Sequence, residues 1–230
     1  RTRPKLVVRF FRQVYEQMRK ENETPAWWRE QLVYQYLYKG PVLEWYMRIK
    51  TKMENNYALF HELLPQKGRI MDIGCGYGFM SYMLHFLSHE RTLLGVDYDE
   101  DKIAVAQHCY IRNEHVRFEA ADITQYDLPN QDAFVILDVL HYLRPESQEK
   151  LVRQCLQKLN PGGVIIVRDG DADLKERHKG TQLTELFSTR LLGFNKTGNK
   201  LSFFSSSTLR GIVEKSGGTM EQIDNTKFTS

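Results

Sequence analysis

Three closely spaced glycines follow a carboxylate at the end of an apolar stretch, and residues of these types can hold a phosphate or a nucleoside. The run is Asp72-Ile73-Gly74-Cys75-Gly76-Tyr77-Gly78. Glycines allow a sharp turn and a close approach of the backbone to a ligand. The N–H groups at the start of a following helix favour an anionic group. A glycine triplet alone is weak evidence, so its meaning depends on what lies further along the chain.

Two more polar positions follow later apolar stretches. Asp97 lies 21 residues past Gly76, close to the roughly 20-residue spacing at which an acid accepts hydrogen bonds from ribose hydroxyls. Ala121-Asp122-Ile123 follows the next apolar stretch, and a polar residue beside an apolar one can bind and cover an adenine ring. These positions predict a nucleoside-containing ligand, which fits both a nicotinamide enzyme and a methyltransferase.

The glycine spacing separates these two alternatives. A dinucleotide fingerprint has its third glycine three residues after the second, where helix and strand close over a pyrophosphate. This sequence has Phe79 at that position and Gly78 one residue earlier. Asp72 would repel a pyrophosphate, whereas it can pair, directly or through water, with the cationic amino acid moiety of an S-adenosyl ligand. The spacing therefore favours an S-adenosyl ligand.

Short apolar strands that alternate with longer helical segments must position these residues. Continuous apolar strands separated by helices predict a parallel sheet that is covered on both faces and joined by right-handed crossovers. Ligands bind beyond the carboxyl ends of such strands, where the polar residues above lie. The predicted strands are 69–73, 92–96, 116–120, 133–137, 164–167 and 219–223; the predicted helices include 79–87, one that Asp99 caps, 151–159 and 208–215, with a turn at 160–163.

At these positions the sequence resembles the class I S-adenosylmethionine-dependent methyltransferases, over about residues 57–170. Besides the glycine run, the matching motifs are Gly95-Val96-Asp97, Ala121-Asp122-Ile123, Asp138-Val139-Leu140-His141-Tyr142-Leu143 and Leu159-Asn160-Pro161-Gly162-Gly163. The resemblance implies a doubly wound, mostly parallel, seven-stranded α/β sheet of the Rossmann-like kind, with one antiparallel strand near the C-terminus. It also implies S-adenosylmethionine as the cofactor. The predicted cofactor-binding residues are Asp72, Gly74, Gly76, Gly78, Asp97, Tyr98, Asp122, Ile123 and Asp138.

The first 52 residues differ in composition from the rest of the chain. They hold 12 Lys and Arg against 5 Asp and Glu and all three tryptophans, whereas the remaining residues hold 20 against 24. We expect a helical, basic and aromatic N-terminal extension or lid over 1–56, and an S-adenosylmethionine-binding domain over 57–230 that is truncated in its last strand. Residues 36–46 resemble the methyltransferase region of bacterial acyltransferase–methyltransferase fusion proteins, which implies an acyltransferase domain upstream in the full-length chain.

Candidate catalytic and acceptor-binding residues lie at the same strand ends. Methyl transfer needs a base only when the acceptor loses a proton as it attacks, as a hydroxyl does. His141 is the candidate base, although it can equally pack beside the cofactor and orient a loop. Arg168 and Asp169 can meet a polar acceptor or pair with each other. The predicted acceptor contacts are Tyr38, Tyr46, Tyr142 and Arg168; the aromatic residues near position 40 can equally seat the N-terminal helices on the sheet.

Three functions fit these residues. The first is methyl transfer to a small-molecule acceptor of the aryl, polyene or lipid-like kind, with transfer to oxygen as one reading. The second is a nucleic-acid methyltransferase, which the basic N-terminal region suggests; against it, residues 138–141 lack the Pro-Pro-aromatic signature that holds a flipped base, and no basic and aromatic stripe is present. The third is a non-catalytic cofactor-binding module of a larger enzyme.

Cysteine usage and hydropathy limit the environment of the chain. Three widely spaced cysteines, Cys75, Cys109 and Cys155, predict neither a disulfide framework nor a zinc site and favour a reducing cytoplasmic compartment. There is no apolar run near the roughly 18 residues of a bilayer span and no secretory signal. The amphipathic spacing over 6–18 fits a helix that covers a core, or a basic helix at the inner face of a membrane.

Overall fold

The computed structural model describes residues 8–9, 27–54, 57–111, 113–170 and 202–223 of the chain. The expected amphipathic helix over 6–18 lies almost wholly outside the described residues, as does the end of the chain where a truncated last strand is predicted. Within the described ranges, no helix is long and apolar enough to cross a bilayer.

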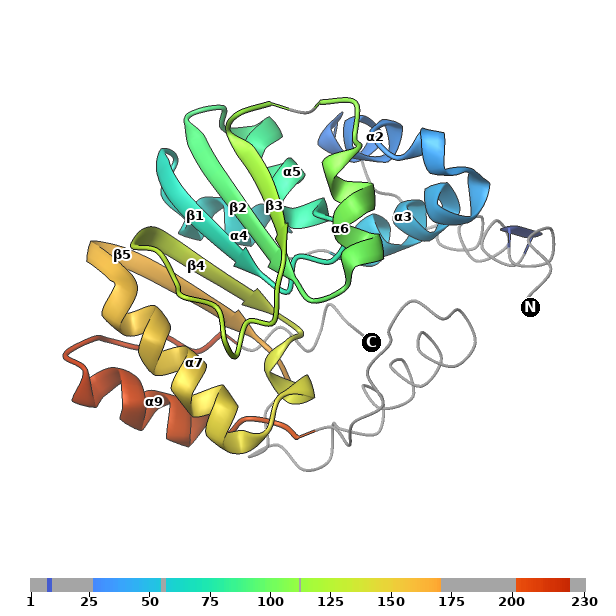
Figure 1. Cartoon of the computed structure of the whole chain (residues 1–230). Helices are drawn as coiled ribbons and strands as arrows, with labels where there is room; N and C mark the ends of the chain where they lie inside the picture. Colours follow the sequence, from blue (N-terminus) through green and yellow to red (C-terminus); the bar gives the residue numbers. More distant parts are fainter. Residues whose placement is uncertain (1–7, 10–26, 55–56, 112, 171–201, 224–230) are drawn as a thin grey trace.

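The centre of the structure is a parallel sheet with the order β3-β2-β1-β4-β5, drawn in Figure 1. Its strands are β1 (Gly68–Ile73), β2 (Arg91–Asp97), β3 (Val116–Ala120), β4 (Gln131–Leu137) and β5 (Leu159–Arg168). The order reverses between β1 and β4, where Asp72 pairs with Val135 on one side and with Gly95 on the other. Ligands of doubly wound sheets bind at such a reversal, so the strand order itself points to the ends of β1 and β4.

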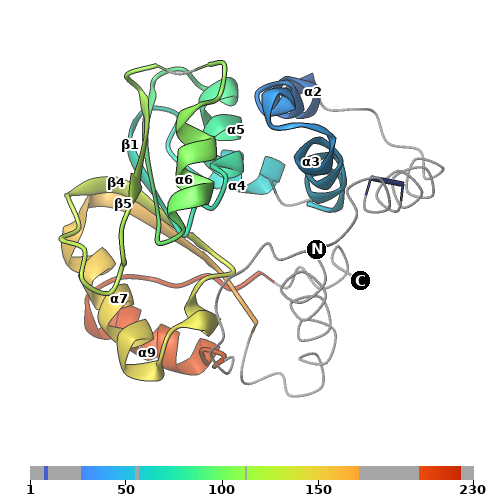
Figure 2. The same cartoon turned by 45° about the vertical axis from the view of Figure 1, so that its right-hand side comes forward.

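Helices cover both faces of the sheet. The helices are α2 (Trp27–Tyr34), η1 (Leu37–Lys39), α3 (Pro41–Met53), α4 (Tyr57–Leu63), α5 (Phe79–Leu87), α6 (Glu100–Gln107), η2 (Leu140–Tyr142), α7 (Pro145–Lys158) and α9 (Ser206–Lys215). Helices α4, α5 and α6 lie on one face with α2 and α3 beyond them, and α7 and α9 lie on the other (Figure 2). Side chains along a strand alternate between faces, so Ile70 packs in the first core layer and Met71 in the second.

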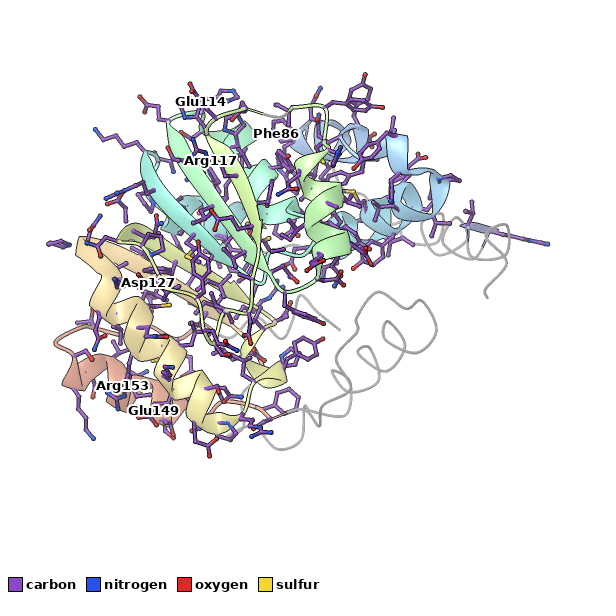
Figure 3. All side chains as sticks on the ribbon, in the orientation of Figure 1. Phe86, Glu114, Arg117, Asp127, Glu149 and Arg153 are labelled. Atoms are coloured by element: carbon purple, nitrogen blue, oxygen red, sulfur yellow. The ribbon has the colours of Figure 1, made fainter. Side chains whose placement is uncertain are left out.

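The local predictions at helix ends are mostly confirmed. Asp99 caps α6, because its carboxylate accepts the N–H groups of Asp101 and Lys102. Ser205 caps α9 through its hydroxyl and the N–H of Thr208. The outer face of α7 is solvated, and there Glu149 and Arg153 form an ion pair one helical turn apart (Figure 3).

Three elements differ from prediction. The helix predicted at 151–159 begins earlier, at Pro145, and ends at Lys158. The turn predicted at 160–163 is instead part of β5, with a shift in register between Gln131 and Ala133 of β4. The strand predicted at 219–223 is wrong, because these residues form no strand. The carbonyl of Met220 instead accepts a hydrogen bond from the side chain of Arg210 in α9. The described residues therefore contain five strands, all parallel, and the implied antiparallel strand has no counterpart among them.

Candidate functional site

The glycine loop leaves the carboxyl end of β1 in a conformation that favours glycine. Gly74, Gly76 and Gly78 have φ angles of 72°, 54° and 77°, the left-handed region that side chains disfavour. At Gly74 a Cβ would also lie 2.2 Å from Cγ2 of Val139, which follows β4. The loop is thus packed against the neighbouring strand end and needs glycine there for space as well as conformation.

Asp97 joins the glycine loop to the end of β2. One carboxylate oxygen accepts the N–H of Gly76 at 2.8 Å, and the other accepts the N–H of Asp99 at 2.9 Å. The residue is 8% exposed. Its neighbour Tyr98 is half exposed to solvent. The Asp97 carboxylate therefore connects the end of β2 to the loop that follows β1. Each of its two oxygens has a second lone pair that can accept another hydrogen bond.

Asp72 is a buried carboxylate beneath the loop. It is 3% exposed and accepts the hydroxyl of Ser81 in α5 at 2.8 Å. Burial raises the pKa of Asp72 to about 6, and the charge of Asp97 acts in the same direction. A cationic group placed nearby would stabilise its ionised form.

Asp122 and Ile123 follow β3, as predicted for an adenine-binding pair. The exposed carboxylate of Asp122 accepts the N–H and hydroxyl of Thr124 at 2.9 and 2.8 Å. These hydrogen bonds, with one from Gln125, lower its pKa. Ile123 is partly buried against the second core layer. The carboxylate of Asp122 is thus held in one orientation at the edge of the site.

A group of four charged side chains lies at the ends of β4, β5 and α3. The guanidinium of Arg168 bridges the carboxylates of Asp138 and Glu54. Burial alone would raise the pKa of Asp138, yet Arg168 and Lys50 hold it below its ordinary value. Burial alone would lower the pKa of Lys50, yet Tyr46, Asp138 and Glu54 raise it. Two cations and two anions therefore balance one another here.

Asp138 is also strained. With φ of 57° it is the one residue other than glycine with a positive φ among those the structure describes. Its N–H donates to the carbonyl of Arg168 at 2.8 Å, so the backbone and the side chain of Asp138 both bind the same residue. Strained residues of this kind gather at functional sites.

His141 pairs with Asp169, the residue that directly follows β5. Nδ1 of His141 lies 2.6 Å from Oδ1 of Asp169, and both side chains are 5% exposed or less. The ring of Tyr142 lies 4.2 Å from the imidazole ring, between centroids. The suggested pairing of Arg168 with Asp169 is thus wrong: each of them pairs with a residue that follows β4.

The two tyrosines predicted as acceptor contacts in the N-terminal helices lie on different parts of the domain. Tyr38 donates its hydroxyl to the carbonyl of Val105 in α6 at 2.7 Å. Tyr46 lies beside the glycine loop, with its ring centroid 6.4 Å from that of Tyr77 and 6.2 Å from that of Phe79. Tyr46 therefore lies near the glycine loop, whereas Tyr38 packs against α6. The predicted contacts of both tyrosines with an acceptor stay predictions.

The residues present fit an adenosyl cofactor. A Cβ at Gly76 would find its nearest neighbour, Cδ of Lys102, at 3.9 Å, so the loop leaves room on that side. The carboxylates of Asp97 and Asp122 supply acceptors for hydroxyl and amino groups. Among the residues described, no group of three or more His, Cys, Asp and Glu is arranged to hold a metal ion.

Several residues of this site escaped the sequence analysis. Lys50 and Glu54 come from the end of α3, and Ser81 comes from α5. Their types are ordinary for helix positions, and their partners lie far away in the chain; Glu54 and Arg168 are 114 residues apart. The one usable signal is Glu54 itself, a carboxylate at a helix C-terminus, where the helix dipole disfavours it.

The sequence of this chain is similar to known methyltransferase-related proteins. Residues 70–163 match the family model described as a methyltransferase domain. The chain is 30% identical over 112 residues to a carboxy-S-adenosyl-L-methionine synthase of Campylobacter concisus, covering 48% of each chain. It is 27% identical over 151 residues to the synthase of that name in Shewanella baltica, covering 64% of this chain and 60% of the relative. The chain thus spans less than two thirds of the curated relatives it matches.

A solved structure has the same fold. The crystal structure of the PH0226 protein from Pyrococcus horikoshii matches with a TM-score of 0.52 and 19% identity, over 73% of this chain and 81% of that chain. At this identity the likeness concerns the fold alone, and it agrees with the Rossmann-like α/β architecture predicted from the alternating strands and helices.

Proposed function

We propose, from the match of residues 70–163 to a family model described as a methyltransferase domain, that the protein transfers a methyl group from S-adenosylmethionine to a small-molecule acceptor of the aryl, polyene or lipid-like kind. The observation that carries the proposal is the meeting of three features at one edge of the sheet. These are the glycine loop, the Asp97 carboxylate that holds it, and the oriented His141 ring.

S-adenosylmethionine, when bound, supplies an electrophilic methyl group on a sulfonium. The lone pairs that Asp97 keeps would accept the ribose hydroxyls. Asp122 would accept a hydrogen bond from the adenine amino group, and Ile123 would cover the ring. Asp72 would balance the cofactor's ammonium group. Most of the acceleration would then come from holding the acceptor in line with the methyl group.

His141 gives the chain a base for a hydroxyl acceptor. Its Nδ1–H donates to Asp169, and this tautomer places the basic lone pair on Nε2. Nε2 would then take the proton that a hydroxyl loses as it attacks. This arrangement supports transfer to oxygen, because a group that attacks without losing a proton needs no such base.

A screen for labelled-methyl transfer tests the proposal. The wild-type chain is incubated with labelled S-adenosylmethionine and hydroxyaryl acids, polyene or fatty acyl acceptors, or RNA, and Asp97→Ala is the inactive control. We expect label in a small-molecule product only. Label in RNA alone would favour the nucleic-acid alternative. Cofactor binding without transfer to any acceptor would favour the non-catalytic module.

A second candidate is a reaction on S-adenosylmethionine itself that makes carboxy-S-adenosylmethionine. Two curated relatives carry the name of that synthase, and the guanidinium of Arg168 at this site already binds carboxylates, those of Asp138 and Glu54. Mass spectrometry of the cofactor after incubation with carboxylic acids, and with no methyl acceptor, separates the candidates. In that reaction the donor acid loses CO2 to the methyl carbon and takes up the proton that this carbon gives up. A cofactor heavier by CO2, beside a donor lighter by CO2, favours the synthase, and an unchanged cofactor favours methyl transfer.

A further inference from the structure

The N-terminal segment touches the glycine loop through one buried hydroxyl. Tyr36, between α2 and η1, is 0% exposed, and its hydroxyl donates to the carbonyl of Tyr77 at 2.6 Å. Its ring packs edge-on against Phe79, 5.3 Å between centroids, and against Tyr82 at 6.3 Å. A residue outside the matched methyltransferase region thus binds the middle of the loop.

The carbonyl that Tyr36 binds belongs to a peptide group held at its other end as well. A peptide group is planar, so the carbonyl of Tyr77 and the N–H of Gly78 turn together. The N–H of Gly78 donates to the carbonyl of Cys75 at 2.9 Å. With Tyr36 on one side and Cys75 on the other, this peptide plane cannot rotate without breaking two hydrogen bonds.

The backbone N–H groups in the first half of the loop bind the end of β2. The N–H groups of Gly74 and Cys75 donate to the carbonyl of Val96, and Gly76 donates to Asp97. These contacts hold the first half of the loop, while Tyr36 contacts the second half, which leads into α5. Burial raises the pKa of Tyr36 far above its ordinary value, so the hydroxyl stays a donor across the physiological range.

We propose that Tyr36 is a positioning residue for the cofactor, and that the segment between α2 and η1 is a fixed brace which holds the glycine loop in its ligand-binding shape. This inference rests on the proposed function, because it assigns the loop to S-adenosylmethionine. It gives the N-terminal region a part in cofactor affinity that differs from that of a lid over the acceptor.

Two tyrosine-to-phenylalanine variants test the brace. Tyr36→Phe removes the hydroxyl and keeps the ring. Tyr82→Phe is the matched control, since Tyr82 is equally buried and donates its hydroxyl to a carbonyl outside the loop, that of Ala106, at 2.7 Å. We expect Tyr36→Phe to raise the Kd and the KM for S-adenosylmethionine about tenfold, as for one lost hydrogen bond, with kcat at saturation unchanged. Tyr82→Phe should leave the Kd unchanged. Both variants should lower the urea midpoint of unfolding by the same amount.

The outcomes separate this inference from the proposed function. If the wild type binds the cofactor and Tyr36→Phe binds it equally well, or if both variants lose the same affinity, the brace is wrong and the proposed function stands. If the wild type does not bind S-adenosylmethionine, both fall. Should Tyr36→Phe fail to fold, hydrogen exchange of the wild type decides: the cofactor must protect residues 34–38 together with 76–78, and protection of the loop alone would overturn the brace.

Discussion

His141 and Asp169 make two hydrogen bonds to each other across the carboxyl ends of β4 and β5. Nδ1 of His141 lies 2.6 Å from Oδ1 of Asp169, and the main-chain N–H of His141 lies 3.2 Å from Oδ2. Two bonds from one residue to one carboxylate hold the imidazole ring in a single orientation. Asp169 is therefore placed to act through His141.

This pair predicts the behaviour of two variants. His141→Gln should lower kcat with a hydroxyl acceptor by about a hundredfold, a typical loss for a general base, and should leave the Kd for S-adenosylmethionine unchanged. Asp169→Asn should lower kcat less, because the base remains and only its orientation is lost. Single-turnover methyl transfer at saturating cofactor measures both. An unchanged rate in His141→Gln would mean that the ring orients a loop and takes no proton.

Asp97 should control cofactor affinity. Asp97→Asn removes the negative charge that holds Gly76 and that would accept the ribose hydroxyls, so the Kd for S-adenosylmethionine should rise about 10- to 100-fold. Asp127→Asn is the control, because its side chain is 98% exposed and forms an ion pair with Lys158, away from the glycine loop. Isothermal calorimetry measures both variants, and equal affinities for the two would contradict the assignment of Asp97.

Asp72 should make stability depend on pH. Burial raises its pKa to about 6 in the folded protein, above the value near 4 of an unfolded chain. The folded state therefore favours the protonated carboxyl; its contribution to stability is complete below about pH 4 and is lost as the pH rises through about 6. Asp72→Asn should flatten the unfolding free energy between these pH values in urea titrations. A wild type whose stability does not fall over this interval would argue against a buried, protonated Asp72.

The same carboxyl should make cofactor binding depend on pH with the opposite sign. If the ionised form of Asp72 balances the ammonium group of S-adenosylmethionine, the affinity should rise as the pH rises through about 6. Binding below that pH should release a proton, which calorimetry in buffers of different ionisation enthalpy detects. Asp72→Asn should bind more weakly at pH 7 and lose the pH dependence; an unaltered profile would place the ammonium group elsewhere.

Gly74 and Gly162 form a matched pair for a test of the loop. Both have positive φ, 72° and 76°, but a Cβ at Gly74 would meet Val139 at 2.2 Å, whereas one at Gly162 would have no neighbour within 4 Å. Gly162→Ala should cost about 1–2 kcal/mol of unfolding free energy for its backbone. Gly74→Ala should cost about 1–3 kcal/mol more for the clash. Equal costs in urea unfolding would show that Val139 moves aside freely.

The alternating strands, the helix starts and the glycine loop could be predicted from the sequence. Each depends on a few neighbouring residues. Asp99 caps the helix that begins at the next residue, and Gly74 allows the chain to turn at its own position. The spacing from Gly76 to Asp97 predicted over a longer range that Asp97 ends the next strand, because one helix between two neighbouring strands has a nearly constant length. The strand predicted at 219–223 failed because its pattern is local, whereas a strand also needs backbone partners in the sheet, and the carbonyl of Met220 binds the side chain of Arg210 instead.

Only the tertiary structure decided which charged and hydroxyl groups meet. Arg168 is next to Asp169 in the chain, yet it binds Glu54, 114 residues away, and Asp138. Tyr36 binds the carbonyl of Tyr77 rather than any residue near it in the chain. The periodicity of a helix tells which face is buried but not what lies against it. Partners at the site depend on which strand ends the sheet order brings to one edge, and that order exists only once the whole domain has folded.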